Sequence, residues 1–298
     1  MRKALKSLAL WPLALAGWYA GLLSRWWPGV GIWWGDRAYQ RARARTSRVI
    51  HPGPAGAVEM TFYVPNEVCR YRADTFSTKE PETLEWIDRY GGTGAFFDIG
   101  ANVGLYSVYY AKTQPGTVYA FEPSVLNVGL LAQNASASGV AAQVVLVPTP
   151  LTSTNQVAEF HLTMLDEGGA MSTFGAEPGH DGGEVRSSME YRTAGVTLDF
   201  LVDSGVVPQR PAMVKIDVDG IEHLILAGAE RTLADPTLRT VLIEVNDDFE
   251  VQAREVDRLM LQAGFVLAER RQADMVATSA FASTFNQIWV RADSTGQR

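Results

Sequence analysis

One apolar run that ends in an acid and then breaks into glycines constrains this chain more than any other part of it. Residues 96–107 have the sequence FFDIGANVGLYS, and a second apolar run over 119–123 ends in Glu122 and Pro123. A strand that stops at a glycine turn and continues into a helix directs backbone N–H groups at a ligand. We therefore predict that a small molecule binds at this turn.

Strands and helices alternate on both sides of this turn. Strands are predicted near residues 95–99, 117–121, 143–147, 212–217 and 240–245, and helices near 82–90, 103–112, 124–138, 219–233 and 249–263. Such alternation indicates a parallel sheet with helices on both faces, and ligands of such sheets lie at the carboxyl ends of the strands. Two late runs, 265–269 and 287–291, have no helical pattern between them and predict an antiparallel pair at the sheet edge.

Two further segments interrupt or precede this pattern. Residues 57–75 hold two short alternating runs, 58–64 and 68–71, on either side of Pro65 and Asn66, which predicts a hairpin after a Pro/Gly-rich linker over 51–56. Residues 157–162 predict an added strand. Residues 166–192 are dense in glycine and polar side chains, and a loop of this length either covers a substrate or is disordered.

The N-terminal segment is apolar and rich in tryptophan. No charge occurs over residues 8–24, and six of the eight tryptophans lie within the first 34 residues. Three interpretations remain open besides a helix packed on the protein itself: an interfacial anchor, a short transmembrane helix, and a secretory signal cleaved at residues 14–16. Pro12 and a second Trp-rich block after Arg25 favour an anchor that lies in the membrane interface.

Charge divides the chain into two unequal parts. Residues 1–48 carry nine basic side chains and one acid, a net charge of +8, which leaves −15 for residues 49–298. A body this acidic is a poor partner for nucleic acid, whose affinity for proteins comes largely from phosphate neutralisation. The basic run between Arg37 and Arg48 is compatible with anionic lipid headgroups and equally with a solvated helix. The single cysteine, Cys69, excludes an intrachain disulfide.

The order of acids and glycines at the turn distinguishes between ligands. The dinucleotide pattern G-x-G-x-x-G has no acid just before it, whereas here Asp98 precedes Gly100 by two residues and the third glycine is missing. A carboxylate at this place repels pyrophosphate and attracts a cationic head such as that of S-adenosylmethionine. Glu122, at the end of the next strand, is placed to accept from two ribose hydroxyls. The predicted binding residues are Asp98, Gly100, Ala101, Asn102, Gly104, Glu122 and Pro123.

A second group of charged residues follows the fourth strand, in the run KIDVDGIEH over 215–223. Lys215 and Asp217 share one face of the strand, and Asp217 ends it at the mouth of the site. Asp217 is the first candidate for substrate contact or general base, although an ion pair with Lys215 would lower its basicity. Asp219 is a second candidate or a helix cap, and Glu244 ends the fifth strand at the same mouth. Asp217, Asp219 and Glu244 also offer oxygens to a metal, but their spacing does not distinguish this role from hydrogen bonding, and no metal is predicted.

These segments together resemble the FkbM-type, class I S-adenosylmethionine-dependent methyltransferases. The matching blocks are DIGANVG over 98–104, FEP over 121–123 with Asn127, Leu131 and Asn134 after it, KIDVDGIE over 215–222, and NQIWVR over 286–291. The resemblance covers roughly residues 57–292. It departs at Asp219, where the family usually has glutamate, and the first 50 residues have no counterpart in it.

The resemblance implies an α/β fold with a Rossmann-like, seven-stranded, mostly parallel sheet, an antiparallel edge strand and helices on both faces, to which the chain adds an N-terminal hydrophobic helical segment and hairpin. Residues 1–50 are predicted to form a Trp-rich, basic membrane-associating segment and residues 51–298 a methyltransferase domain, with its hairpin over 57–75 and its core over 93–292.

The predicted activity is O-methylation, by S-adenosylmethionine, of a hydroxyl on a small molecule or glycan: a sugar, a glycolipid or a secondary metabolite. The predicted location is the cytoplasmic face of a membrane, reached through residues 1–34, and no nucleic acid is expected as a partner. The alternative is a non-catalytic accessory or structural subunit that keeps the fold and docks on a membrane complex.

Overall fold

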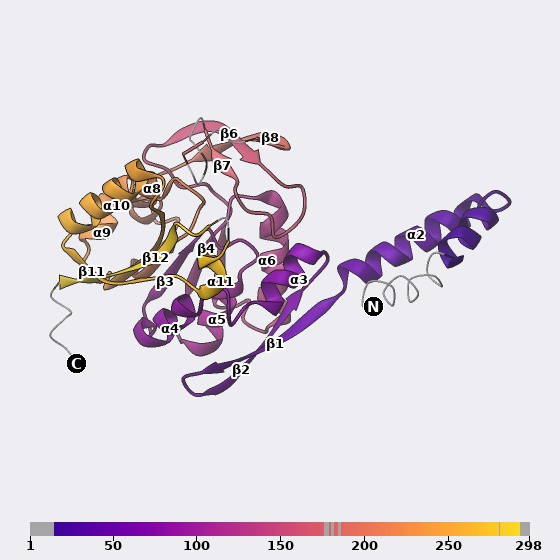
Figure 1. Cartoon of the computed structure of the whole chain (residues 1–298), viewed down its shortest axis with the longest axis horizontal. Coiled ribbons are helices and arrows are strands. Elements are labelled where there is room, and N and C mark those ends of the chain that lie inside the picture. Colours follow the sequence, from indigo (N-terminus) through magenta and orange to yellow (C-terminus); the bar gives the residue numbers. More distant parts are fainter. Residues whose placement is uncertain (1–14, 176–178, 180–181, 184–185, 280, 293–298) are drawn as a thin grey trace.

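The computed structural model describes residues 15–175, 179, 182–183, 186–279 and 281–292, and its centre is a sheet of seven strands (Figure 1). The strand order is β11(Phe265–Arg271), β12(Thr284–Arg291), β10(Thr240–Asn246), β9(Pro211–Ile216), β3(Ala95–Ile99), β4(Val118–Phe121) and β5(Val144–Val147). The pairs from β10 to β5 are parallel, and β12 is antiparallel to both of its neighbours. The predicted mostly parallel sheet is thus confirmed, but the reversed strand is the second from the edge, with β11 outside it.

Helices cover both faces of this sheet because the central strands are apolar on both sides. Phe96 of β3 joins one core cluster and Phe97, its neighbour in the strand, joins the other. The helices are α3(Glu67–Asp74), α4(Pro81–Tyr90), α5(Leu105–Thr113), α6(Val125–Ala137), α7(Leu198–Asp203), α8(Glu222–Ala227), α9(Glu230–Ala234), α10(Glu250–Gln262) and α11(Asp274–Ala277). Helices α4, α5 and α6 contribute to the Phe96 cluster, and α7 to α10 contribute to the Phe97 cluster.

The predicted hairpin over residues 57–75 is wrong in its second half. The run 56–63 forms β2(Gly56–Tyr63), but its partner is the preceding strand β1(Thr46–Gly53). The Pro/Gly-rich segment 51–56, predicted as a linker, contains the end of β1, the turn at residues 54–55 and the start of β2. Residues 68–71 instead belong to helix α3, because Asn66 caps it by accepting a hydrogen bond from the Cys69 amide at 2.8 Å. The β1–β2 hairpin packs on α5 and α6.

Smaller differences concern the second half of the chain. The helix predicted over 219–233 is divided into α8 and α9, because the chain turns at Gly228, where a side chain would meet the carbonyl oxygen of Thr152 at 2.3 Å. The short helix α11 lies between the last two strands, where none was predicted. The added strand is confirmed as β6(Gln156–Leu162), which pairs with β7(Thr173–Phe174) and β8(Met189–Gly195) in a separate three-stranded sheet.

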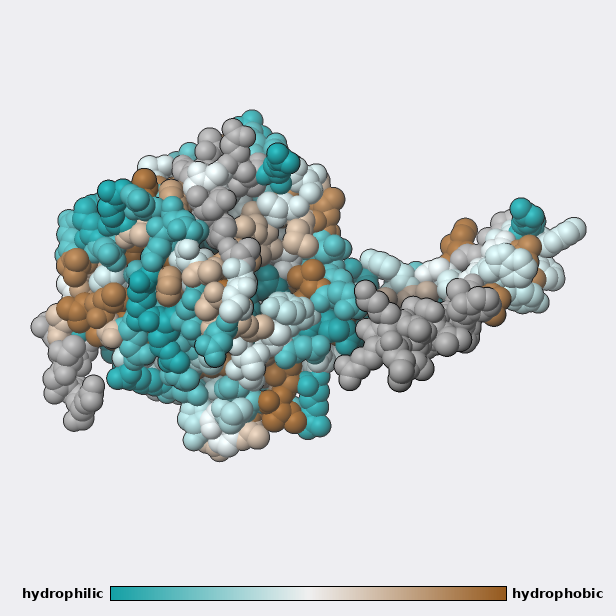
Figure 2. All heavy atoms as spheres, in the orientation of Figure 1, coloured by the Kyte–Doolittle hydropathy of each residue, from teal (hydrophilic) through white to brown (hydrophobic). Residues whose placement is uncertain are grey.

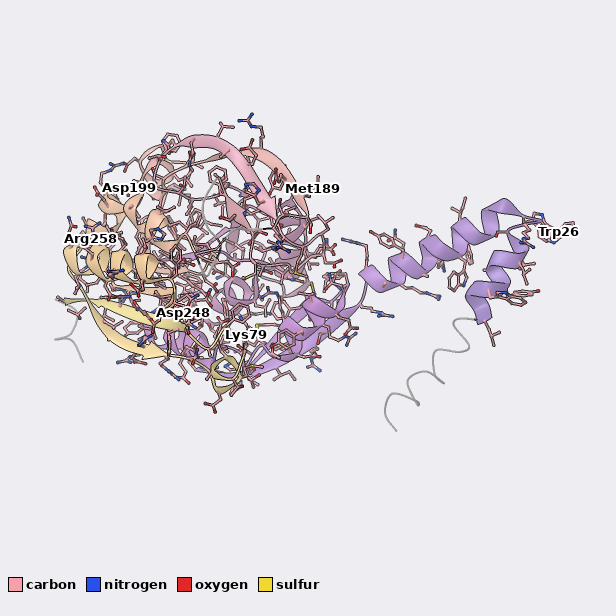
Figure 3. All side chains as sticks on the ribbon, turned by 45° about the horizontal axis from the view of Figure 1, so that its top comes forward. Trp26, Lys79, Met189, Asp199, Asp248 and Arg258 are labelled. Carbon is pink, nitrogen blue, oxygen red and sulfur yellow. The ribbon has the colours of Figure 1, made fainter. Side chains whose placement is uncertain are left out.

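The N-terminal residues form an arm that projects from the body (Figure 1). The arm consists of a helical segment over residues 15–23 and helix α2(Pro28–Arg43), joined by a turn that carries Trp26 at the far tip (Figure 3). The two helices are in contact, since a Cβ atom on Gly17 would lie 3.4 Å from the ring of Trp34. Within the part of the chain that has been described, no helix is both long enough and apolar enough to cross a membrane. Pro12 and the first part of the apolar run, residues 8–14, lie outside the described residues.

Candidate active site

The predicted turn is built from two glycines with left-handed backbone. Gly100 has φ of 82°, and a Cβ atom there would lie 1.8 Å from the carbonyl oxygen of Asp217. Gly104 has φ of 85° and precedes the first residue of α5. The amide of Asp217 donates to the Ile99 carbonyl at 3.1 Å, so the ends of β3 and β9 are joined beside the turn. Only glycine allows the chain to approach β9 this closely.

Asp98 lies directly below the turn and is 1% exposed. Its Oδ2 accepts a hydrogen bond from the Ser107 hydroxyl at 2.5 Å, whereas its Oδ1 is buried and has no partner among the described residues. Burial raises the pKa of Asp98, and the nearby charge of Lys215, its register neighbour on β9, opposes this shift. A buried carboxylate oxygen without a donor fits a ligand that carries a cationic or N–H group.

Glu122 stands at the end of β4 with its carboxylate held in a fixed orientation. Its oxygens accept hydrogen bonds from the amides of Asn102 and Ser124, both at 2.8 Å, and from the side chain of Asn127 at 3.4 Å. Burial raises the pKa of Glu122 to about 7. Because a carboxylate has more lone pairs than these three donors use, it retains the capacity to accept from ligand hydroxyls.

A cleft of about 620 Å³ opens beside Gly100, Asn102 and Glu122. Its polar side is formed by the glycine turn, and its far side is apolar, with wall residues Phe121, Leu151, Phe160, Phe174, Ile221 and Ile225. This division matches a ligand with a charged head, a ribose and a flat aromatic base. The oriented Glu122 carboxylate and the turn that excludes a side chain at Gly100 together fit S-adenosylmethionine. Asp98 lies beneath the turn and does not itself line the cleft. Of the other predicted residues, Pro123 lines this cleft, Ala101 lies beside it in the turn, and Gly104 starts the helix behind it.

A segment that we call the strap, residues 166–175, lies across this cleft. The carbonyl of Gly169 accepts from the side-chain amides of Asn102 and Asn127 at 2.8 and 3.1 Å. The amide of Met171 donates to Asp219 Oδ2 at 2.6 Å, so Asp219 holds the strap. The glycine-rich loop predicted over 166–192 therefore begins as an ordered cover of the cleft; residues 176–178, 180–181 and 184–185 lie outside the described part.

A second and larger cavity, of about 1,170 Å³, adjoins the cleft. Gly100, Asn102, Ala170, Asp217 and Asp219 line both spaces. The second cavity adds polar groups from several elements, among them Lys79, Glu80, Glu82, Glu244, Gln272 and Asn286. A bound methyl donor and a methyl acceptor can thus meet at the ends of β9 and β10.

Two ion pairs organise the wall between these spaces. Lys215, which is 1% exposed, donates from Nζ to Asp217 Oδ2, and its ammonium lies 5.1 Å from the ring centroid of Tyr106. Lys79 pairs with Glu80, whose Oε2 also accepts from the Tyr106 hydroxyl at 2.8 Å. Burial opposes the ionisation of Glu80, but the charges of Lys79 and Lys215 outweigh it and lower the pKa of Glu80 to about 2.

The four predicted catalytic residues therefore occupy different positions at one mouth. Asp217 and Glu244 face the second cavity from neighbouring strand ends, Lys215 is buried behind Asp217, and Asp219 lies toward the strap. Sequence reasoning missed Lys79 and Glu80, which precede α4, because nothing in their local pattern links them to the end of β9. These assignments remain predictions.

Comparisons with known proteins place the chain in a family. The model of the methyltransferase FkbM domain matches residues 98–267. The 31-O-demethyl-FK506 methyltransferase FkbM of Streptomyces tacrolimicus is 30% identical over 196 residues, which cover 58% of this chain and 74% of that protein.

Solved structures also match the chain, and two of them serve as examples. A methyltransferase FkbM from Methylobacillus flagellatus has a TM-score of 0.44 at 12% identity and covers 67% of this chain, and the match spans 44% of that protein's length. Fibrillarin of Aeropyrum pernix, solved with S-adenosylmethionine, has a TM-score of 0.39 at 10% identity, with 67% of each chain covered.

The glycine turn, the oriented Glu122 carboxylate and the matched family model define the class as S-adenosylmethionine-dependent methyltransferases. Within that class, the chain belongs to the FkbM methyltransferase family. S-adenosylmethionine is accordingly its cofactor and supplies an electrophilic methyl group. The residues of this chain that would hold it are Asp98, Asn102 and Glu122.

Proposed function

We propose that this methyltransferase acts on a hydroxyl of an uncharged sugar, glycolipid or similar secondary metabolite, at the cytoplasmic face of a membrane. The observation that carries the proposal is the second cavity, which shares its wall with the cofactor cleft at Asp217 and Asp219. The name of the Streptomyces relative refers to an oxygen acceptor, which favours oxygen here as well.

The charge of this cavity supports an uncharged acceptor. Its wall carries five acidic side chains, Glu80, Glu82, Asp217, Asp219 and Glu244, against two basic ones, Arg72 and Lys79. Lys79 is already paired with Glu80. A phosphorylated or carboxylated acceptor would be repelled by this excess, whereas hydroxyl groups can donate hydrogen bonds to the carboxylates. Apolar wall residues such as Tyr71, Val276 and Phe281 suit the hydrophobic part of such a molecule.

The arm supports a membrane surface as the place of action. Trp26 is 84% exposed and Trp33 is 62% exposed, although tryptophan side chains usually avoid water unless an interface accepts them. Arg37 lies 5.5 Å from the ring centroid of Trp33, so a cation adjoins the aromatic surface. In Figure 2 the arm shows brown apolar patches among pale residues of intermediate hydropathy, as expected of a segment that lies in a headgroup layer.

The test is transfer of a labelled methyl group. Purified full-length protein is incubated with methyl-tritiated S-adenosylmethionine and an organic extract of cells that lack the active enzyme, and tritium is followed into the extract. We expect label on a neutral, hydroxyl-bearing molecule, and no transfer by Glu122→Ala, which removes the ribose acceptor. Absence of both methyl transfer and cofactor binding by calorimetry would instead support an accessory subunit that keeps only the fold.

A further inference from the structure

Three carboxylates meet at the place where the cofactor cleft adjoins the second cavity, which we call the acceptor cavity. Oxygens of Glu80, Asp217 and Glu244 lie within 4.8 Å of one another. Asp217 and Glu244 have equivalent positions on neighbouring parallel strands, each two residues beyond the register pair Lys215 and Leu242. Methyl transfer to a hydroxyl releases a proton, and one of these groups is placed to accept it.

Two of the three carboxylates, those of Glu80 and Asp217, form ion pairs with lysines. Glu80 is bound by Lys79 and by the Tyr106 hydroxyl, and its pKa of about 2 makes it a weak base. Asp217 is bound by Lys215, a lysine that is almost fully buried. A proton on Asp217 would leave the Lys215 ammonium without its closest counter-ion in a buried position, which costs several kcal/mol as an order of magnitude.

Glu244 differs from both of its neighbours. Among the described residues, the side chain of Glu244 takes part in no hydrogen bond or ion pair, while Glu82 accepts from Asn286 and Asp219 accepts from the Met171 amide. It is partly buried and lines the acceptor cavity. Burial raises the pKa of Glu244 well above the usual glutamate range, and the negative charges of Asp217, Glu80 and Asp219 raise it further, against the opposing charge of Lys79.

We propose that Glu244, and not Asp217, is the general base of the reaction; this inference rests on the proposed function. The acceptor oxygen forms a bond to the methyl carbon, and the carbon–sulfur bond breaks with its electron pair left on sulfur. The hydroxyl proton moves to a carboxylate oxygen of Glu244. Lys215 and Lys79 act as positioning residues, since they bind Asp217 and Glu80 and leave Glu244 as the member of the cluster whose carboxylate has no partner among the described residues.

The groups that face Glu244 come from three parts of the fold, and their charges influence the pKa of its carboxyl group. Lys79 and Glu80 precede α4, Asp217 and Asp219 follow β9, and Asn286 lies directly opposite on β12 in the register of the two strands. This group contains two lysines, Lys79 and the buried Lys215. It contains four carboxyl groups, those of Glu80, Asp217, Asp219 and Glu244, so acidic side chains are in excess. A proton released by the acceptor therefore moves into a site that favours it.

The experiment compares Glu244→Gln with Asp217→Asn in single-turnover methyl transfer from tritiated S-adenosylmethionine to the cell extract, over a range of pH. We expect Glu244→Gln to slow transfer by about 10²- to 10⁴-fold, to lose the rise of the wild-type rate with pH, and to bind S-adenosylmethionine as the wild type does. Glu244→Asp should restore part of both rate and pH dependence. Unchanged rate and pH profile in Glu244→Gln, or loss of the pH dependence in Asp217→Asn alone, would overturn the assignment.

A second measurement needs no acceptor and separates this inference from the proposed function. Infrared difference spectra between wild type and Glu244→Gln report the carbonyl band of a protonated carboxyl group as pH is changed. We expect that band to persist in the wild type above the pH range in which ordinary glutamates ionise, and to be missing from the variant. A Glu244 carboxyl that titrates in the ordinary glutamate range would overturn the inference even if methyl transfer is found. If no methyl transfer is found, the proposed function fails while this titration still decides the state of Glu244.

Discussion

At the scale of single residues, the predicted contact of Glu122 with the cofactor ribose would couple cofactor binding to pH. Its pKa is about 7 in the free protein because burial disfavours the charged form. Ribose hydroxyls donate hydrogen bonds, which favour the ionised carboxylate, so the bound cofactor must lower this pKa. Binding therefore releases a proton near neutral pH.

We predict that the affinity for S-adenosylmethionine rises with pH until about pH 7 and is level above it, because protonated Glu122 is the weaker acceptor. Below the plateau, affinity should fall by up to about tenfold per pH unit. Calorimetry in buffers of different ionisation enthalpy measures both affinity and proton release. Glu122→Gln should bind more weakly and show a flatter pH dependence, which separates Glu122 from other buried carboxyls such as Asp98 and Glu222. An affinity that is flat or falls toward pH 7 in the wild type would contradict this account.

At the scale of elements, the strand–turn–helix unit from β3 to α5 depends on the absence of a side chain at Gly100. We predict that Gly100→Ala lowers the free energy of unfolding by about 3 kcal/mol or more, since it adds a clash with the Asp217 carbonyl to the strain of a left-handed residue. Gly139→Ala is the matched control: Gly139 has φ of 72° but open space around it, and should cost about 1 kcal/mol. Urea unfolding compares them, and equal losses would show that the close approach to β9 is unimportant.

The turn could be predicted from sequence because its determinants lie within a few residues: an apolar strand, an acid, two glycines and a helix. The hairpin was predicted with the wrong partner strand for the opposite reason, because its pairing is not determined locally. Residues 58–64 carried a correct strand pattern, but pairing forward to 68–71 or backward to 46–53 depends on tertiary contacts that the pattern does not contain. Asn66, a strong helix cap, was the local evidence that favoured α3.

The acceptor side of the site was less accessible to sequence reasoning. Glu80 precedes Asp217 and Glu244 by more than a hundred residues in the chain, and the three meet only through the tertiary fold. Asp217 and Glu244 were found because acids at strand ends face a common edge. Lys79 and Glu80 stand before a helix, where an acid is ordinarily explained by the helix dipole.

At the scale of the whole molecule, the arm and the body differ in what their surfaces attract. The arm presents exposed Trp26, Trp27 and Trp33 together with arginines, whereas the body carries the excess of acids. At the base of the arm, Arg43 of α2 pairs with Glu167 of the strap at 2.6 Å, so the arm is joined directly to the cover of the cofactor cleft.

We predict that the full-length protein sediments with vesicles that contain anionic phospholipid, and that replacement of Trp26, Trp27 and Trp33 by serine reduces the bound fraction severalfold. A matched triple variant, Val251→Ser, Leu261→Ser and Val266→Ser, removes exposed apolar side chains from the body and should bind as the wild type does. Equal vesicle binding by the arm variant and the wild type would refute membrane docking by the arm.

The position of the reversed strand β12 at the end of the chain has a consequence for the order in which the two cavities are synthesised. Its first residues, Thr284 and Asn286, line the acceptor cavity, yet they follow every other part of that cavity in the chain. The residues that line the cofactor cleft lie between Ile99 and Ile225, so all of them are synthesised before Glu244 and before the part of the acceptor wall from Gln272 to Asn286. The β12 part of the acceptor wall is thus the last part of either space that translation adds.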